Sequence, residues 1–226
     1  LDPYANAFNA TDSGAHFDPD DLDLHPGVWE RKYEIDSLAF PVQLAHQLWR
    51  ATGDASHLDG AIRAGCRSIV ELWAREQHHF ERSQYRHVRP SEPWDTLGSD
   101  GRGTPVGYTG MTWSGFRPSD DACVHGYNIP AQLMAVKALR LIGEFASLWA
   151  DDALAADAQF LRHEIRRGVE KFGLTDGRYA YEVDGLGAQL FMDDANMPSL
   201  LSLPLVGDVA VDDPTYLATR AWVLSD

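Results

Sequence analysis

Three times along this chain, an irregular polar stretch that carries acids leads into an apolar helical pattern. The transitions read EIDSL at Glu34–Leu38, SDDAC at Ser119–Cys123 and DDANMPSL at Asp193–Leu200. After each apolar pattern a second one follows. This alternation predicts consecutive helical hairpins joined by long loops at one rim, and it leaves little room for an extensive sheet.

Apolar residues that recur at intervals of three and four predict six helices. They cover roughly residues 36–51, 56–79, 128–149, 152–172, a segment that starts near 196, and 214–224. Asp36 or Ser37 is expected to cap the first helix, and Gly53 to follow its C-terminal end. Pro130 and Pro198 would lie in the first turn of the third and fifth helices, where proline is tolerated.

Two long stretches lack any sustained period. Residues 1–35 are rich in Asp, Asn, Gly and Pro and are expected to form a loop, and residues 80–126 are irregular as well. A long structureless opening is uncommon in a compact domain, which favours a functional loop. The run RYAYEV at Arg178–Val183 predicts a short strand that ends at the turn Asp184–Gly185.

The composition fits one soluble domain over residues 1–226. The formal net charge of −15 argues against nucleic acid and anionic membranes as partners, because both require a basic surface. No apolar run approaches the length of a membrane span. Cys66 and Cys123 have no CxxC spacing, so two free thiols in a reducing, cytoplasmic compartment are expected.

The segment Gly110–Ala122 reads GMTWSGFRPSDDA and combines a Trp, a Phe, an Arg and two adjacent carboxylates without a helix or strand period. Aromatic rings stack on the faces of pyranose sugars, and carboxylates transfer protons. This composition favours a carbohydrate site. The alternative is that Asp120 and Asp121 only cap the next helix and interact with its dipole.

The same segment resembles the signature of glycoside hydrolase family 125, the metal-independent exo-α-1,6-mannosidases. Four further segments agree with the family in the same order, and together they cover nearly the whole chain. They are DPYANAFN at 2–9, GVWERKYEIDSL at 27–38, YEVDGLG at 181–187 and MDDANMPSLL at 192–201.

The resemblance implies an all-α fold, part of an (α/α)6 toroid of helical hairpins with long rim loops, to which the strand and turn at 178–185 would add a short β-hairpin. Relative to the family, the chain lacks a leading GDIPAMWLRD-like segment and a trailing MHES-like segment. We therefore expect a single catalytic-type domain without its N- and C-terminal portions.

The resemblance also implies an inverting enzyme that removes terminal α-1,6-linked mannose from an oligosaccharide. Its general acid corresponds to Asp121, with Asp120 as the second choice, while the general base of the MHES-like segment would lie outside this chain. Arg117 is expected to hold a neighbouring carboxylate or to bind a hydroxyl group.

Other polar and aromatic side chains at the expected rim are candidates for substrate binding, because carboxylates and amides suit vicinal hydroxyl groups. With Arg117, they are Trp29, Glu30, Arg31, Asp36, Trp113, Asp193, Asp194, Asn196 and Asn6. The simpler interpretation of the charged run at 29–36 is a solvated face, and Asn6 would then form only a turn.

Neither a metal nor another cofactor is expected. His78, His79 and His125 lack the spacing of known metal motifs, and DPDDLD at 18–23 lacks the Gly and terminal Glu of an EF-hand loop. GRGTPVG at 101–107 follows no predicted strand, which argues against a phosphate loop.

Two other classes of function stay open on the sequence alone. One is a carbohydrate-binding protein, or an inactive fragment of an enzyme, without turnover. The other is a different toroid enzyme, such as a polysaccharide lyase or a phosphorylase. A lyase would act on an acidic sugar, for which a chain of net charge −15 is a poor electrostatic match.

Overall fold

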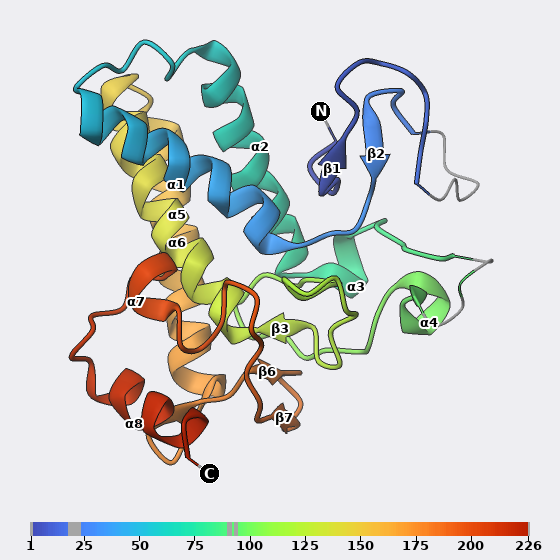
Figure 1. The fold of residues 1–226 in the computed structure, drawn as a ribbon, viewed down its shortest axis with the longest axis vertical. Helices are drawn as coiled ribbons and strands as arrows, with labels where there is room; N and C mark the ends of the chain where they lie inside the picture. The colour runs from blue at the N-terminus through green and yellow to red at the C-terminus, as the bar shows by residue number, and fades with distance from the viewer. Residues whose placement is uncertain (1, 18–23, 90–91, 93–94, 226) are drawn as a thin grey trace.

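The computed structural model describes residues 2–17, 24–89, 92 and 95–225. Figure 1 shows a helical body on one side and loops with short strands on the other. The long helices are α1 (Ile35–Thr52), α2 (Gly60–Glu76), α5 (Ile129–Leu148), α6 (Asp152–Phe172) and α8 (Pro214–Val223). Three single-turn helices are α3 (His79–Arg82), α4 (Gly98–Gly101) and α7 (Leu203–Val206).

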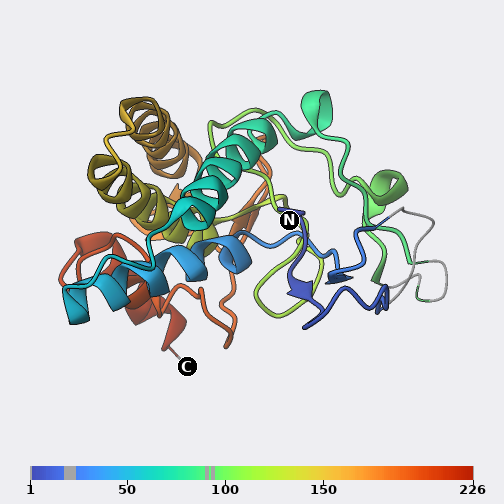
Figure 2. The same cartoon turned by 90° about the horizontal axis from the view of Figure 1, so that it is seen from above.

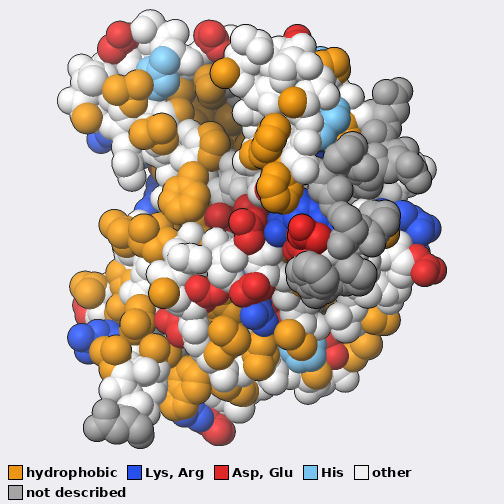
Figure 3. Space-filling model, turned by 45° about the vertical axis from the view of Figure 1, so that its right-hand side comes forward, with side chains coloured by type: hydrophobic (Ala, Val, Ile, Leu, Met, Phe, Trp, Pro, Cys, Tyr) orange, Lys and Arg blue, Asp and Glu red, His pale blue; other side chains and the backbone are white. Residues whose placement is uncertain are grey.

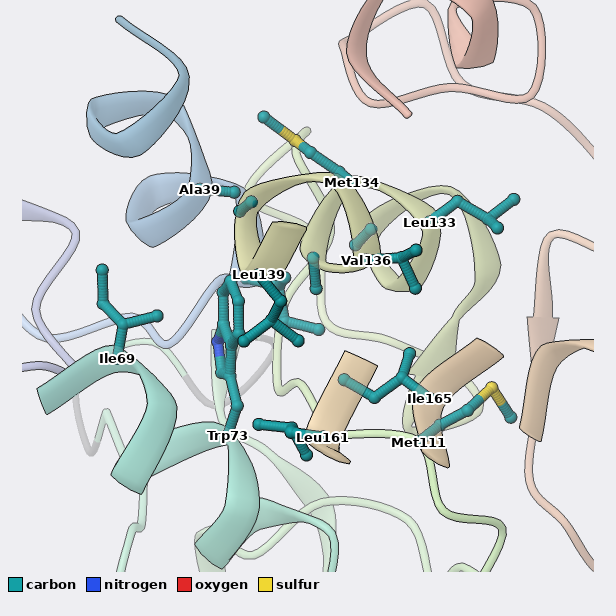
Figure 4. Close-up of a cluster of buried hydrophobic side chains, with 14 of the residues drawn as sticks. Ala39, Ile69, Trp73, Met111, Leu133, Met134, Val136, Leu139, Leu161 and Ile165 are labelled. Carbon is teal, nitrogen blue, oxygen red and sulfur yellow. The ribbon is translucent and has the colours of Figure 1, made fainter. Parts of the chain in front are cut away.

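Helix α5 is the centre of the body because it is apolar on almost every side. It packs against α6, α1, α2 and α7, and Figure 2 shows α1 and α2 crossing the α5–α6 pair. Figure 4 shows the core where four of these helices meet the loop that precedes α5. The labelled residues are Ala39, Ile69, Trp73, Met111, Leu133, Met134, Val136, Leu139, Leu161 and Ile165.

The hairpin prediction holds closely for α5 and α6, which pack along their length. The α1–α2 pair differs, because α1 packs chiefly on α5 and α2 chiefly on α6. Both α1 and α2 are thus second-layer neighbours of the central hairpin. Within the described part of the chain, the helices form an open arc and do not close into a barrel.

Local capping explains where four of the five long helices begin. Asp59, Asn128, Asp151 and Asp213 accept hydrogen bonds from the free backbone N–H groups at the starts of α2, α5, α6 and α8. Helix α2 therefore begins at residue 60 and not near 56. The predicted cap of α1 by Asp36 or Ser37 is wrong: the capping position falls at residue 34, and no side chain bonds the backbone there.

Short strands replace part of the expected loop. β1 (Ala7–Phe8) pairs with β2 (Val28–Glu30) inside the opening stretch. The predicted strand at 178–183 is split into β5 (Arg178–Tyr179), which pairs with β4 (Leu174–Thr175), and β6 (Glu182–Val183). β6 lies between β3 (Tyr127–Asn128) and β7 (Gln189–Leu190), so the turn after Val183 closes a β-hairpin.

The helix predicted near residue 196 is absent, and only α7 forms, seven residues later. The carboxylate of Asp193 accepts the backbone N–H groups of Leu200 and Leu201, and Asp194 accepts that of Asn196. These side chains compete with helical bonds for the backbone donors and hold the segment in turns.

No helix in the described ranges is both long enough and apolar enough to cross a lipid bilayer.

Candidate active site

The two adjacent aspartates lie at the tip of a narrow loop. Phe116 and Ala122 form an antiparallel bridge, and the Arg117 N–H donates to the Asp121 carbonyl at 2.8 Å. Asp120 has a left-handed backbone with φ of 68°, which turns the chain at the tip. Because Asn128 caps α5, the capping interpretation of Asp120 and Asp121 is wrong.

One side of this tip faces the segment between β2 and α1. The ammonium group of Lys32 donates to the Asp120 carbonyl at 3.1 Å and lies 3.8 Å from its carboxylate. The carboxyl groups of Glu34 and Asp120 are hydrogen-bond partners. Asp36 belongs to the same group of acids. Asp120 is therefore joined to residues that lie more than 80 positions earlier in the chain.

Burial changes the acidity of this cluster. Burial and the nearby Asp36 carboxylate raise the pKa of Glu34 to about 8. Burial, together with the charge of Asp120, raises the pKa of Asp36 to about 7. Protonated Glu34 can therefore donate its hydrogen bond to Asp120 near neutral pH.

Asp36 has one carboxylate oxygen, Oδ1, that is buried without a hydrogen-bond partner among the described residues. The residue is 8% exposed. A buried acceptor is ordinarily satisfied, and exceptions concentrate at functional sites. Asp36 thus keeps an unused acceptor next to the loop tip.

The other side of the tip faces the segment after β7. Ser119 donates to Asp121 Oδ2 at 3.1 Å and is also a hydrogen-bond partner of Asp194. The Tyr181 hydroxyl contacts Asp194 Oδ2 at 3.5 Å. Burial opposes ionisation of Asp194, but the Asn196 N–H, Ser119 and the charge of Arg117 together lower its pKa.

Arg117 is held in place by a buried carboxylate, that of Glu182. Its Nε donates to Glu182 Oε1 at 2.5 Å, and the other Glu182 oxygen accepts the His125 N–H at 2.9 Å. Glu182 is completely buried, on β6. The ion pair anchors the loop to the central three-stranded sheet, so Arg117 is a structural anchor of the tip.

Asn6 and Glu30 fix the position of Lys32. Asn6 donates to Glu30 Oε2 at 3.0 Å and accepts the Lys32 backbone N–H at 3.1 Å. Glu30 also pairs with Arg89 at 2.5 Å. Trp29 is 38% exposed and lies beside Phe17. Among Asn6, Glu30 and Trp29, only Trp29 therefore offers a partly exposed aromatic ring.

The structure separates three other candidates from the tip. Trp113 is 1% exposed and stacks on His79 with ring centroids 3.5 Å apart, so no ring face is open to a sugar. Arg31 turns to the opposite side and pairs with Asp2 at 2.6 Å. The carboxylate of Asp193 is occupied by backbone donors, as described above.

The sequence-based selection missed Ser119 and Tyr181, and it considered Lys32 and Glu34 only as members of the charged run at 29–36 without selecting them individually. A signal for selecting Lys32 and Glu34 was present, because alternate residues of an extended segment point to one face. Residues 32 and 34 precede α1 in such a segment. Ser119 and Tyr181 carried no comparable signal in the sequence.

The described residues contain no group of three or more His, Cys, Asp or Glu side chains arranged to hold a metal ion. His78 stacks on Tyr108, and His79 pairs with Glu76 at 2.6 Å. The DPDDLD segment at 18–23 lies outside the described residues. Figure 3 shows acidic and basic side chains gathered in the middle of one face, bordered by apolar ones.

The raised pKa values of Glu34 and Asp36 predict a pH dependence of stability. The folded state binds the protons of Glu34 and Asp36 more tightly than the unfolded state, so their contribution is full below about pH 4 and is lost as the pH rises toward 7 and 8. Each group contributes a slope of up to about 1.4 kcal/mol per pH unit. Urea unfolding across this range measures it.

Glu34→Gln and Asp36→Asn should each flatten the slope. Glu81→Gln is the matched control, because the Glu81 side chain is 77% exposed. The same slope in all three variants would show that the cluster does not bind these protons.

The sequence as a whole was compared with known proteins. The model of the family "Metal-independent alpha-mannosidase (GH125)" matches residues 1–226. The chain belongs to this family. Its all-α architecture is accordingly part of the GH125 helical toroid, and the structural comparison agrees with that assignment.

Two similar proteins, one of them a solved structure, show how much of the sequence and the fold is shared. A solved Streptococcus pneumoniae structure, from work on metal-independent α-mannosidases, is a non-productive complex with α-1,6-mannobiose. It is 43% identical and superposes with a TM-score of 0.93 over 99% of this chain and 55% of that chain. The Meiotically up-regulated gene 157 protein of Schizosaccharomyces pombe is 38% identical over 88% of this chain and 42% of its own length. This GH125 chain thus spans about half the length of these relatives.

Proposed function

We propose that this GH125 chain supplies the general-acid side of an active site that removes terminal α-1,6-linked mannose with inversion. The observation that carries the proposal is the loop tip, where adjacent carboxylates lie between two groups of polar side chains. The similarity to a protein solved with α-1,6-mannobiose supports the choice of substrate.

The general acid in this proposal is Asp121. Its Oδ2 accepts one hydrogen bond, from Ser119, while no described residue is bonded to Oδ1. Asp120 is engaged by Lys32 and Glu34, so we assign it the role of holding the tip in place. A free carboxyl oxygen on an exposed side chain can reach the glycosidic oxygen of a bound sugar.

The base is a separate carboxylate in an inverting enzyme, because the two groups stand roughly 6.5–9.5 Å apart with a water between them. Glu34 is engaged with Asp120, and no described residue is identified as a base opposite Asp121. As the resemblance to the family implies, the proposal places the base outside these 226 residues. Asp194, Asp36 and Trp29 are the proposed sugar contacts within them.

Time-resolved proton NMR of α-1,6-mannobiose tests this proposal. With a longer protein that contains this chain, β-mannose should appear first, and the rate should be unchanged by a chelator. With the 226 residues alone, the sugar signals should broaden without cleavage. α-Mannose as the first product would contradict inversion, and a lack of both cleavage and broadening would contradict the site.

A second candidate function is carbohydrate binding without turnover. It is favoured by the observation that Glu34 and Asp36 interact with Asp120, while neither is identified as a base opposite Asp121. The two functions differ in one result: cleavage by the longer protein supports hydrolysis, and broadening in both proteins without cleavage supports binding alone.

A further inference from the structure

An open hollow of about 580 Å³ lies between the N-terminal residues and the segment that follows α2. Arginines dominate its lining. The lining includes Asp2, Arg31, Arg75, Arg82, Gln84 and Arg86. The candidate active site lies elsewhere, because Arg31 faces the hollow whereas its neighbour Lys32 faces Asp120.

The hollow is basic on a strongly acidic chain. Among the described residues, four guanidinium groups line it against one carboxylate, while the chain has a formal net charge of −15. The carboxylate, Asp2, is already paired with Arg31 at 2.6 Å. Glu81 lies nearby in the sequence but is directed to His78, at 3.6 Å. The positive charge of the other three arginines is therefore not neutralised by another described side chain of the lining.

Those three arginines keep most of their donors available. Arg82 forms no ion pair with any described residue. Arg86 donates one N–H to the Asp100 carbonyl at 3.2 Å, and Arg75 is a hydrogen-bond partner of the Tyr4 hydroxyl. A guanidinium group has five N–H donors, so several in each group can still bind a ligand.

The floor of the hollow selects against a neutral sugar. The Arg31 guanidinium lies over the rings of Tyr4 and Tyr85, at 4.8 and 5.0 Å from their centroids. Both rings are buried, at 7% and 1% exposure. No bare aromatic face remains for a pyranose to stack on, so recognition there depends on guanidinium and amide donors.

We propose that this hollow binds a phosphate-bearing anion through Arg75, Arg82 and Arg86, with Gln84 as an additional amide donor. Guanidinium groups bind phosphate oxygens with two parallel hydrogen bonds, which matches a cluster of them around one open space. The volume exceeds that of a single phosphate, so a diphosphate engages more of the arginines than orthophosphate does.

Isothermal titration at low ionic strength tests the proposal, with pyrophosphate and orthophosphate as probes and chloride at equal ionic strength as the reference. Pyrophosphate should bind more tightly than orthophosphate. The double variant Arg82→Gln/Arg86→Gln should bind pyrophosphate at least about tenfold more weakly, because charge-assisted hydrogen bonds are lost. The affinity of Arg82→Lys/Arg86→Lys for pyrophosphate should lie between those of the unaltered chain and the Gln double variant. Lysine keeps the positive charge but cannot form the two parallel hydrogen bonds of a guanidinium group.

The matched control is Arg167→Gln/Arg220→Gln, which removes the same charge from exposed positions on α6 and α8. This control should change the affinity for pyrophosphate by no more than about twofold, because exposed charges far from the hollow are screened by salt. Equal losses in the two double variants would overturn the site in favour of diffuse attraction. Absence of binding to the unaltered chain would overturn it as well. Thermal unfolding of every variant separates a loss of binding from a loss of fold.

Discussion

Asp121→Asn is expected to lower kcat for α-1,6-mannobiose by about 10²–10⁴-fold in a longer protein that contains these residues. The departing sugar is an alkoxide unless its oxygen is protonated as the bond breaks. An amide cannot supply that proton, although it keeps the shape and the contact with Ser119. Mannobiose binding, measured by NMR titration, should stay within a few-fold, so the loss should appear in kcat.

An aryl mannoside with an acidic phenol is the decisive control substrate. Its leaving group departs without a proton, so Asp121→Asn should cost far less on this substrate than on mannobiose. Asp120→Asn should reduce both rates by a similar factor, because its proposed role is to position the tip. An equal loss on both substrates for Asp121→Asn, or a leaving-group dependence for Asp120→Asn alone, would reverse the two roles.

Trp113→Ala is expected to destabilise the fold by about 3–5 kcal/mol. The indole is buried against the His79 ring on one side. Backbone packs closely at its edges: a Cβ added at Gly126 would lie 2.3 Å from the indole, and one at Gly103 would lie 2.7 Å from it. Because these glycines fit directly against the ring, the truncated side chain would leave a cavity. Urea unfolding at constant pH measures the loss.

Trp29→Ala is the matched control, since that ring is 38% exposed. Its effect on stability should be within about 0.5–1 kcal/mol, and any effect on mannoside binding should appear here. If Trp113→Ala instead kept full stability and lost mannoside affinity, a sugar would have to stack on Trp113 and the buried position would be contradicted.

The helical part of the fold could be predicted from the sequence because its causes are local. The starts of α5 and α6 follow from Asn128 and Asp151, which bond donors only three residues away. The end of α1 follows from Gly53, whose φ of 73° suits glycine. The apolar period needs only neighbours within a few turns. The adjacent aspartates were also visible as a pair in an irregular segment.

Where local chemistry competed with the pattern, the sequence-based prediction was wrong. The segment that begins near Asn196 has an apolar run with Pro198 in the favoured first turn. Asp193 nevertheless takes up backbone donors seven and eight residues away. That contact depends on the path of the whole turn, so spacing alone could not show it.

Only the tertiary structure decided which side chains face a ligand. Trp113 and Trp29 are the same residue type in similarly irregular surroundings, but the packing of His79 buries one and leaves the other partly exposed. Glu34 reaches Asp120 across 86 positions of sequence, as their shared hydrogen bond shows. The sequence by itself determined the helices and the two aspartates, because caps and periods act over a few residues. The raised pKa of Glu34 could be seen only in the folded chain, because it depends on burial. The same holds for the placement of Asp120 beside Lys32 and of Asp121 beside Ser119 and Asp194, because the contacts with Lys32 and Asp194 join distant parts of the sequence.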